Sequence, residues 1–407
     1  MAVTRGLIAV SYCLPPMLMP RSIQVSRLLD HTRRLGWDPV VVTPDRPPAT
    51  LTLDPVLDRH YHGRFRRAEV AVRTEPKLAW WRALYQPWAA EQLESAWIKA
   101  AVARAKDLIR QEKPAALVTF GQPWSDHLVG LALKRRYPAL PWIAHFSDPW
   151  VDSPYHTATP VTRKAEADVA AAADALVFTN TAAVELVMGK YPAAWRGKTH
   201  VLPHALEPEL TPLLKPADGG RTGFRLAHVG NLFTGRLPDQ TLYAVAMLRD
   251  RGRLPPGFIL ELVANQSTGV GRLIRELGLR EQVRVGGAMP YGESLRHMAS
   301  ADALLLIDGD HPGRNVFLPS KIMDYLAVGR PILGATPADS PSHQLLADFG
   351  QPSAAPSDRQ GLADALSRLL AGEVPTPDPR VAIERFGADR VARQFCDILD
   401  GLGRTLR

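Results

Sequence analysis

The chain has 407 residues, 46% hydrophobic and 22% charged, a balance that excludes a disordered protein and, at this length, predicts two domains of about 200 residues each. Its formal net charge of +8 favours anionic partners such as nucleotides or phosphates. Only two cysteines occur and no apolar run reaches the ~20 residues of a membrane span, which excludes a disulfide framework and fits a cytoplasmic protein.

The first half of the chain alternates apolar runs with amphipathic patterns. Such alternation predicts a parallel β-sheet that helices cover on both faces. The expected strands are 7–12, 40–43, 115–120, 142–146, 175–179 and 200–202. The expected helices are 21–35, 125–136, 161–172 and 182–190.

Residues 46–82 do not follow this alternation, and they lead into a segment rich in tryptophan. Trp80, Trp81 and Trp88 lie near several arginines. A surface of this composition favours contact with a membrane face or a lipid-linked acceptor. The alternative is that these rings pack a long helix, 89–111, against the sheet.

The alternation restarts after a segment rich in Pro and Gly at 211–222, which we interpret as a linker. The expected strands are 225–229, 258–263, 283–285, 303–307 and 331–333, and the expected helices are 238–249, 270–277, 291–299, 319–328 and 361–370. Two doubly wound, Rossmann-like domains facing across a cleft are therefore expected, with bounds 1–210 and 211–385. A last segment, 386–407, is expected to form a helix that packs back on the first domain.

The stretch from Leu318 to Leu333 is the most informative part of the chain. Pro319 suits a helix start and Gly329 suits a helix end. Backbone N–H groups near Ser320, together with the Lys321 ammonium, would bind a diphosphate. Lys321 and Asp324 are three residues apart and so share one helix face. The alternative is an exposed ion pair of about 0.3–0.5 kcal/mol.

Two further loops follow strands, where open α/β sheets bind ligands. After strand 225–229 come Gly230, Asn231 and Arg236, and the arginine would hold phosphate oxygens through two hydrogen bonds. After strand 142–146 come His145 and Asp148, which we expect to point into the cleft. The alternative for this pair is an Asx turn at Asp148 and a buried core histidine.

Other patterns carry less information. The glycines of a dinucleotide fingerprint, a P-loop and a zinc protease motif do not occur. Asp308 and Asp310 look like a metal-binding carboxylate pair, but we set them aside because they follow a late strand. No nucleic-acid reader motif is recognised, so we expect no nucleic-acid partner.

These motifs together resemble the GT-B glycosyltransferases of family 4, over nearly the whole chain. The resemblance rests on G-N-x4-R-x-P-D at 230–239, on P-S-K-x2-D-Y-L-A-x-G-x-P-I at 319–332, and on the D-P-W at 148–150. It implies retaining transfer of a hexose-type sugar from a nucleotide-diphosphate sugar to a glycan, lipid-linked or small-molecule acceptor. It also implies no bound metal or cofactor, and a role in polysaccharide or glycoconjugate biosynthesis.

The resemblance also implies residue roles. Asp324 matches the glutamate that holds the ribose, and Arg236 matches the basic residue that holds the diphosphate, with Lys321 beside it. Arg21 stands where the family has a glycine-rich loop in the first domain, and it would serve as a phosphate or acceptor contact. His145 and Asp148 are expected to contact a sugar.

Two positions depart from the family pattern. Val316 stands where the first glutamate of the family's E-x7-E pair would be, and Asn231 stands where an arginine is common. Two alternatives therefore stay open, a nucleotide-sugar 2-epimerase and a non-catalytic protein that binds nucleotide-sugars. We expect a cytoplasmic protein, either free or peripheral on the cytoplasmic membrane face.

Overall fold

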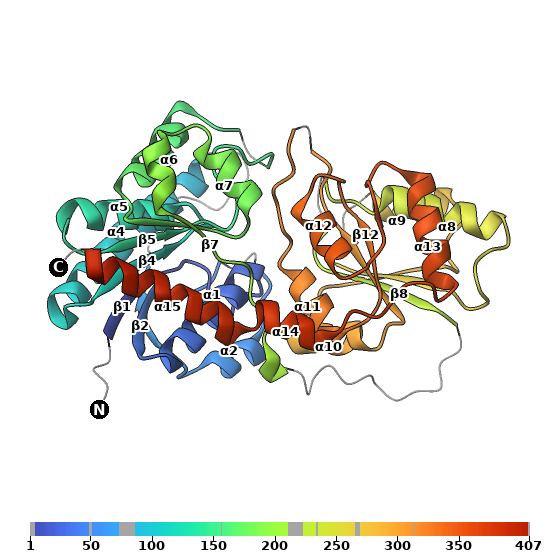
Figure 1. Ribbon diagram of the computed structural model, residues 1–407, viewed down its shortest axis with the longest axis horizontal. Helices are drawn as coiled ribbons and strands as arrows, with labels where there is room; N and C mark the ends of the chain where they lie inside the picture. Colours follow the sequence, from blue (N-terminus) through green and yellow to red (C-terminus); the bar gives the residue numbers. More distant parts are fainter. Residues whose placement is uncertain are drawn as a thin grey trace. The chain divides into compact units, whose positions relative to one another are not determined.

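The computed structural model describes residues 5–48, 51–72, 86–155, 157–210, 223–232, 235–264, 269–311 and 313–405, with the backbone alone at 86–93 and 404–405. The chain divides into two units (Figure 1). Unit 1 comprises Met1–Ala205 together with Ala388–Arg407, and unit 2 comprises Leu206–Gly387. Leu206 pairs with Gly387 through an isolated bridge, so the two ends of unit 2 meet.

Unit 1 is built on a parallel sheet of seven strands in the order β3-β2-β1-β4-β5-β6-β7. The strands are β1 Arg5–Val10, β2 Trp37–Pro44, β3 Arg66–Val70, β4 Ala116–Phe120, β5 Trp142–His145, β6 Ala175–Phe178 and β7 Thr199–Val201. Strands β4, β5 and β6 are buried at every position. A parallel sheet covered on both faces has this pattern, because neither face reaches water.

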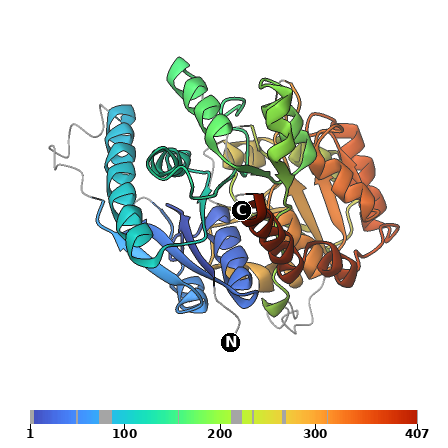
Figure 2. The same cartoon turned by 60° about the vertical axis from the view of Figure 1, so that its left-hand side comes forward.

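Helices cover the sheet of unit 1. They are α1 Pro20–Arg34, α2 Pro55–Tyr61, α4 Gln86–Glu112, α5 Ser125–Arg136, α6 Pro160–Ala172, α7 Thr181–Met188 and α15 Ala388–Thr405, with a 3-10 helix at Ala193–Lys198. Helix α15, from the end of the chain, packs along α1 (Figure 1, Figure 2). The expected return of the last helix to the first domain is confirmed.

Unit 2 has a parallel sheet of six strands in the order β10-β9-β8-β11-β12-β13. The strands are β8 Arg225–Val229, β9 Ile259–Val263, β10 Val283–Gly286, β11 Ala303–Ile307, β12 Ile332–Ala335 and β13 Ser353–Ala354. The helices are α8 Asp239–Asp250, α9 Val270–Glu276, α10 Tyr291–Ala299, α11 Lys321–Val328, α12 Pro341–Asp348, α13 Arg359–Leu370 and α14 Pro379–Phe386. Leucines of β9, β11, β12 and α13 fill the core of this unit.

The fold class is confirmed, since both units are doubly wound parallel sheets. Strands β3 and β13 and helices α2, α12 and α14 lie outside the predicted elements. Strand β3 escaped prediction because it is an edge strand, in which Arg66 and Glu69 face water between buried neighbours. Helices α2 and α14 are short and begin at prolines after capping aspartates, Asp54 and Asp378.

Some predictions fall outside the described residues. The proposed linker 211–222 and the side chains of Trp80, Trp81 and Trp88 belong to this group. None of the described helices combines the length and the apolar character that crossing a membrane requires.

Candidate functional site

The sheet of unit 2 reverses its winding between β8 and β11. The chain leaves β8 toward β9 on one side, and it returns to place β11 on the other side. In such sheets the crevice at the carboxyl ends of these two strands is the usual ligand site. Gly230 follows β8 and Asp308 follows β11, so both loops meet at this point. Residues that the sequence predicted separately thus come from one edge of one sheet.

Gly230 and Lys321 are in contact at this edge. Gly230 has φ +142°, a conformation that favours glycine, and a Cβ atom there would lie 2.3 Å from Lys321 Nζ. The Lys321 Nζ is enclosed by the protein and has no hydrogen-bond partner among the described residues, although part of its side chain reaches the surface. Burial, with the nearby charge of Arg236, lowers the pKa of Lys321 from 10.5 to about 7.

Arg236 is held by Asp308, a buried carboxylate at the end of β11. Arg236 Nη2 donates to Asp308 Oδ1 over 3.0 Å, and the backbone N–H of Gly309 donates to the same oxygen. The hydroxyl of Ser342, on α12, donates to Asp308 Oδ2 over 2.6 Å. Asp308 therefore fixes the direction of the Arg236 guanidinium and is itself fixed from two elements. It is a structural anchor for the arginine.

Helix α11 carries Lys321 at its first position, two residues after Pro319. Pro319 and Ser320 form the turn that opens the helix, since their carbonyl oxygens accept from the N–H groups of Ile322 and Met323. Gly329, at φ +67°, ends the helix as predicted. The helix is tied to the sheet by the Tyr325 hydroxyl, which accepts from the N–H of Val229 and donates to the carbonyl of Leu305.

Asp324 lies one turn deeper on α11 and is held from a second helix. The hydroxyl of Tyr291, at the start of α10, donates to Asp324 Oδ1 over 2.7 Å. Burial lowers the pKa of the neighbouring His228 well below its ordinary value, with the Lys321 charge adding to the effect. The imidazole of His228 is therefore neutral and has a single N–H, which donates to one of the two carbonyl oxygens beside its ring nitrogens, Leu305 at 2.9 Å or Gly230 at 3.2 Å.

The two departures from the family pattern occupy different surroundings. Val316 is 1% exposed and packs in the interior of unit 2, whereas Asn231 is exposed. Lys321, Arg236, Gly230, Ser320 and Asp324 therefore form one site, while Val316 contributes no polar group to it. Tyr291, Asp308 and Ser342 complete the site; sequence reasoning missed Tyr291 and Ser342, and it considered Asp308 only as a metal ligand and set it aside.

In unit 1, the structure brings Arg21 and His145 together. Arg21 is 6% exposed, and its Nη2 donates to the carbonyl oxygen of His145 over 2.8 Å. The guanidinium also lies 5.4 Å from the ring centroid of Phe120. His145 ends β5, while Arg21 lies in the first turn of α1. Burial, with the charge of Arg21, lowers the pKa of His145 well below its ordinary value.

Asp148 lies in a partly exposed loop, near enough for its charge to raise the pKa of Arg21 against the effect of burial. Its carboxylate accepts a hydrogen bond of 2.6 Å from the amide of Gln122. The loop is anchored by the fully buried Glu166 of α6, which accepts from the N–H of Val151 over 2.8 Å. Lys190 and the Tyr191 hydroxyl also donate to Glu166, each over 2.7 Å. Glu166 therefore positions the segment that carries Asp148.

The switch point of unit 1 lies between β1 and β4 and holds a buried carboxylate. Asp126, at the start of α5, accepts from the N–H of Tyr12 over 2.8 Å and from the indole of Trp97 over 2.7 Å. Burial raises the pKa of Asp126 to about 7. These bonds tie α4, α5 and the loop after β1 together, so their role is structural.

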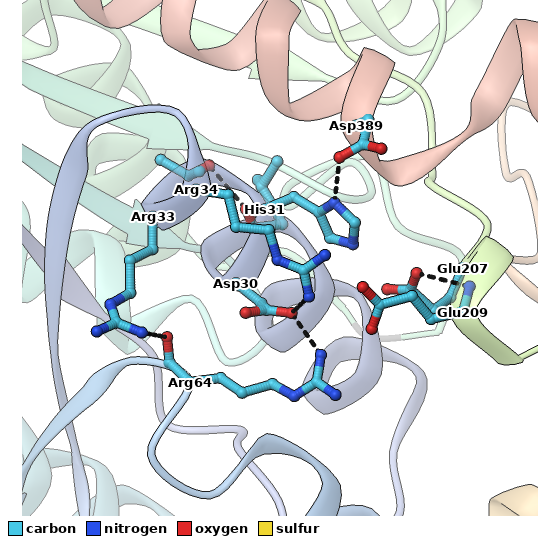
Figure 3. Close-up of polar contacts among 10 residues, drawn as sticks. Asp30, His31, Arg33, Arg34, Arg64, Glu207, Glu209 and Asp389 are labelled. Carbon is cyan, nitrogen blue, oxygen red and sulfur yellow. Dashed lines mark hydrogen bonds and ion pairs between the residues drawn. The ribbon is translucent and has the colours of Figure 1, made fainter.

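The outer part of α1 carries a second polar cluster (Figure 3). Asp30, which is largely buried, accepts from Arg34 over 2.7 Å and from Arg64 over 2.8 Å. The imidazole of His31 lies 2.7 Å from the carboxylate of Asp389 on α15. Arg33 is exposed and donates to the carbonyl oxygen of Arg64. These bonds fasten α1 to its neighbours within unit 1.

Comparison with known proteins gives a family match for the first unit. Residues 22–205 match the family described as glycosyl transferase 4-like domain. No curated protein matches the chain by sequence.

Solved structures match nearly the whole chain. A sucrose-phosphate synthase from Thermosynechococcus elongatus has 15% identity and a TM-score of 0.72, with 98% of this chain and 100% of that chain covered. HepE from Anabaena, in complex with UDP and glucose, has 15% identity and a TM-score of 0.69 at the same coverage. A UDP-N-acetylglucosamine 2-epimerase has 11% identity and a TM-score of 0.58, with 97% and 95% covered. At these identities the structural matches establish the fold.

Proposed function

We propose that this chain is a glycosyltransferase that moves a sugar from a nucleotide-diphosphate sugar to an acceptor, which the glycosyl transferase 4-like match at residues 22–205 and the GT-B fold support. One observation carries the proposal. Among the residues that the structure describes, the Lys321 ammonium is enclosed without a hydrogen-bond partner, beside Arg236 and at the switch point of unit 2. A buried cation is costly unless an anion compensates it, so this site is built for an anionic ligand.

The diphosphate of the donor is the anion that suits this site. Breaking the bond to the sugar leaves negative charge on the β-phosphate, and two cations there would stabilise it. Asp308 orients the Arg236 guanidinium and, as its ion-pair partner, partly compensates its charge. Lys321 makes no such ion pair among the described residues, so it supplies most of the positive charge available to a ligand. Removing one such contact typically raises the barrier by about 2.7–4 kcal/mol.

Asp324 is proposed to accept hydrogen bonds from the ribose hydroxyls. Its Oδ1 is engaged by Tyr291, which fixes the carboxylate before a ligand arrives. The Asp324 side chain is one methylene shorter than the family's glutamate. We therefore propose that the hydrogen bond from Tyr291 holds the Asp324 carboxylate in the position where it can bind the ribose. A Tyr291→Phe variant should raise the KM for the donor and leave kcat nearly unchanged.

We further propose that transfer retains the anomeric configuration and needs no metal ion. The resemblance to family 4 supports retention, and the two cations Arg236 and Lys321 offer the charge compensation that a divalent ion would supply. Nuclear magnetic resonance of the fresh product would report its anomeric configuration. The rate should be the same with and without a chelator, and a rate that requires added Mg²⁺ or Mn²⁺ would contradict this part.

The acceptor is proposed to bind in unit 1, where His145 and Asp148 are the predicted sugar contacts. A glycan, a lipid-linked sugar and a small molecule are the candidate classes, in keeping with polysaccharide or glycoconjugate biosynthesis. Peripheral contact with the cytoplasmic membrane face stays a prediction based on the composition around Trp80. Salt-dependent binding to vesicles that contain anionic lipid would support it.

The test of the function is a nucleotide-release assay. The protein is incubated with a panel of nucleotide-sugars, with and without candidate acceptors, and the released nucleotide is measured. Acceptor-dependent release that is lost in Arg236→Ala supports transfer, and Arg272→Ala, an exposed position on α9, is the matched control. Formation of an epimer without an acceptor would identify a 2-epimerase instead. Donor binding without turnover would identify a non-catalytic protein.

A further inference from the structure

Unit 1 contains a cavity that neither the sheet core nor the predicted donor site uses. Its enclosed volume is about 20 Å³, and the open space at its mouth brings the total to about 310 Å³. Its polar lining comes from Arg21 and Gln24 of α1, His145 at the end of β5, and His204 after β7. Phe120 and several aliphatic side chains form the rest of the wall.

The lining of this cavity carries the positive charge of Arg21 and no carboxylate. Arg21 is 94% buried by area (6% exposed), its Nε has no hydrogen-bond partner, and no ion pair of the described residues includes it. Two other buried charges of unit 1 are paired with opposite charges: Asp30 with two arginines, and Glu166 with Lys190. Among the described residues, the hydrogen-bond partners of Arg21 are the carbonyl oxygen and ring of His145, and the charge of Asp148, which does not line the cavity, acts on it from farther away.

The burial of Arg21 beside His145 disfavours positive charge on both side chains, and this effect lowers their pKa values. Burial lowers the pKa of Arg21 from 12.5 to about 10. The pKa of His145 is lowered as well, through burial and through the charges of Arg21 and His204. An anion placed in the cavity would reverse each of these effects, because it would stabilise every positive charge around it.

We propose that this cavity binds an acidic oxygen group, a phosphate or a carboxylate, carried by the acceptor substrate. Arg21 would donate to the oxygens through its unpartnered Nε, and ring N–H groups of His145 and His204 would add donors. The assignment of the group to the acceptor rests on the proposed function. The presence of an anion site does not, because it follows from unit 1 alone.

Direct binding of inorganic phosphate tests the site without any turnover. The protein is labelled with ¹⁵N-histidine, and the signals of His145 and His204 are followed as phosphate is added. Saturable shifts are expected in the wild type. Arg21→Gln should weaken the affinity by about tenfold or more, since it removes a charged hydrogen bond. The matched control is Arg33→Gln, which removes an exposed arginine from the same helix (Figure 3). Equal affinity in Arg21→Gln and wild type would overturn the proposal.

A second variant tests the same proposal while Arg21 stays in place, so the test does not depend on the folding of Arg21→Gln. Gln24 accepts a hydrogen bond of 3.2 Å from the N–H of Ala205, and a glutamate oxygen can accept the same bond. Gln24→Glu therefore adds a carboxylate to the cavity wall without removing that contact. It should raise the melting temperature, because it compensates Arg21, and it should abolish phosphate binding. Unchanged phosphate binding in Gln24→Glu would overturn the proposal.

A competition experiment distinguishes an anion of the acceptor from the diphosphate of the donor. The phosphate titration is repeated with UDP at saturating concentration. Shifts of His145 and His204 that persist under UDP support an acceptor site, whereas displacement of phosphate by UDP would show that the cavity serves the donor and would overturn the proposal. If the nucleotide-release assay shows no transfer while phosphate still binds, the proposed function fails and the anion site stands.

Discussion

The substitution Lys321→Met should make the protein more stable and at the same time remove its affinity for a nucleotide diphosphate. Methionine has nearly the same length and no charge, so it fills the space beside Gly230 without a buried ammonium. The gain arises because the folded state holds this lysine at a pKa of about 7 instead of 10.5. The unfolded chain binds the proton more tightly, which disfavours folding of the wild type.

The magnitude follows from linkage between protonation and folding. A pKa of about 7 in the folded state and 10.5 in the unfolded state corresponds to a cost on the order of 4 kcal/mol at pH 7 and about 2 kcal/mol at pH 9. Because the unfolded state binds more protons between these two values, the free energy of unfolding of the wild type rises with pH through this window. The variant lacks the group and so lacks this rise.

Denaturant titrations at pH 7 and pH 9 measure the effect. We expect Lys321→Met to exceed the wild type in free energy of unfolding at pH 7 and to exceed it by clearly less at pH 9. Arg272→Met, which removes an exposed charge on α9, should match the wild type at both values. UDP binding, measured by calorimetry, should be lost in Lys321→Met and kept in the control. A variant that is less stable than the wild type, or a difference independent of pH, would refute the reasoning about a buried uncompensated amine.

Three further substitutions test the surroundings of the two sites. Asp308→Asn removes the charge partner of Arg236, and it should lower kcat with the donor by about tenfold or more, measured by nucleotide release; unchanged kinetics would remove Asp308 as the anchor of Arg236. Gly230→Ala places a Cβ 2.3 Å from Lys321 Nζ at φ +142°, and it should weaken UDP binding in calorimetry, whereas Gly252→Ala, where φ is also positive and nothing lies within 4 Å, should not. Glu166→Gln weakens the bonds to Val151, Lys190 and Tyr191, while Lys190 keeps Asp152, and it should lower the free energy of unfolding by about 1–3 kcal/mol; an unchanged free energy of unfolding would show that the Glu166 cluster does not anchor the Asp148 loop.

The sequence predicted the fold because its signals are local. Apolar runs such as those of β4, β5 and β11 are buried at every position, and Gly329 ends α11 in the left-handed conformation that favours glycine. Strand β3 gave no such signal, since its charged residues face water at the edge of the sheet.

The candidate site was predictable only in part, because its contacts join distant segments. Gly230, Arg236 and Lys321 were predicted from motifs, and the sheet order brings them to one edge. Tyr291 precedes Asp324 by 33 residues, and Ser342 follows Asp308 by 34 residues, so neither contact leaves a pattern in a short window. Asp308 was set aside as a possible metal ligand, and the structure instead pairs it with Arg236.

The measurement that tests the central claim most directly is acceptor-dependent nucleotide release by the wild type and by Lys321→Met, with donor and acceptor taken from the panel. We expect release by the wild type that depends on the acceptor, and no release by the folded variant above the uncatalysed rate. Release by Lys321→Met at the rate of the wild type would contradict the claim that the buried lysine of α11 binds the donor diphosphate.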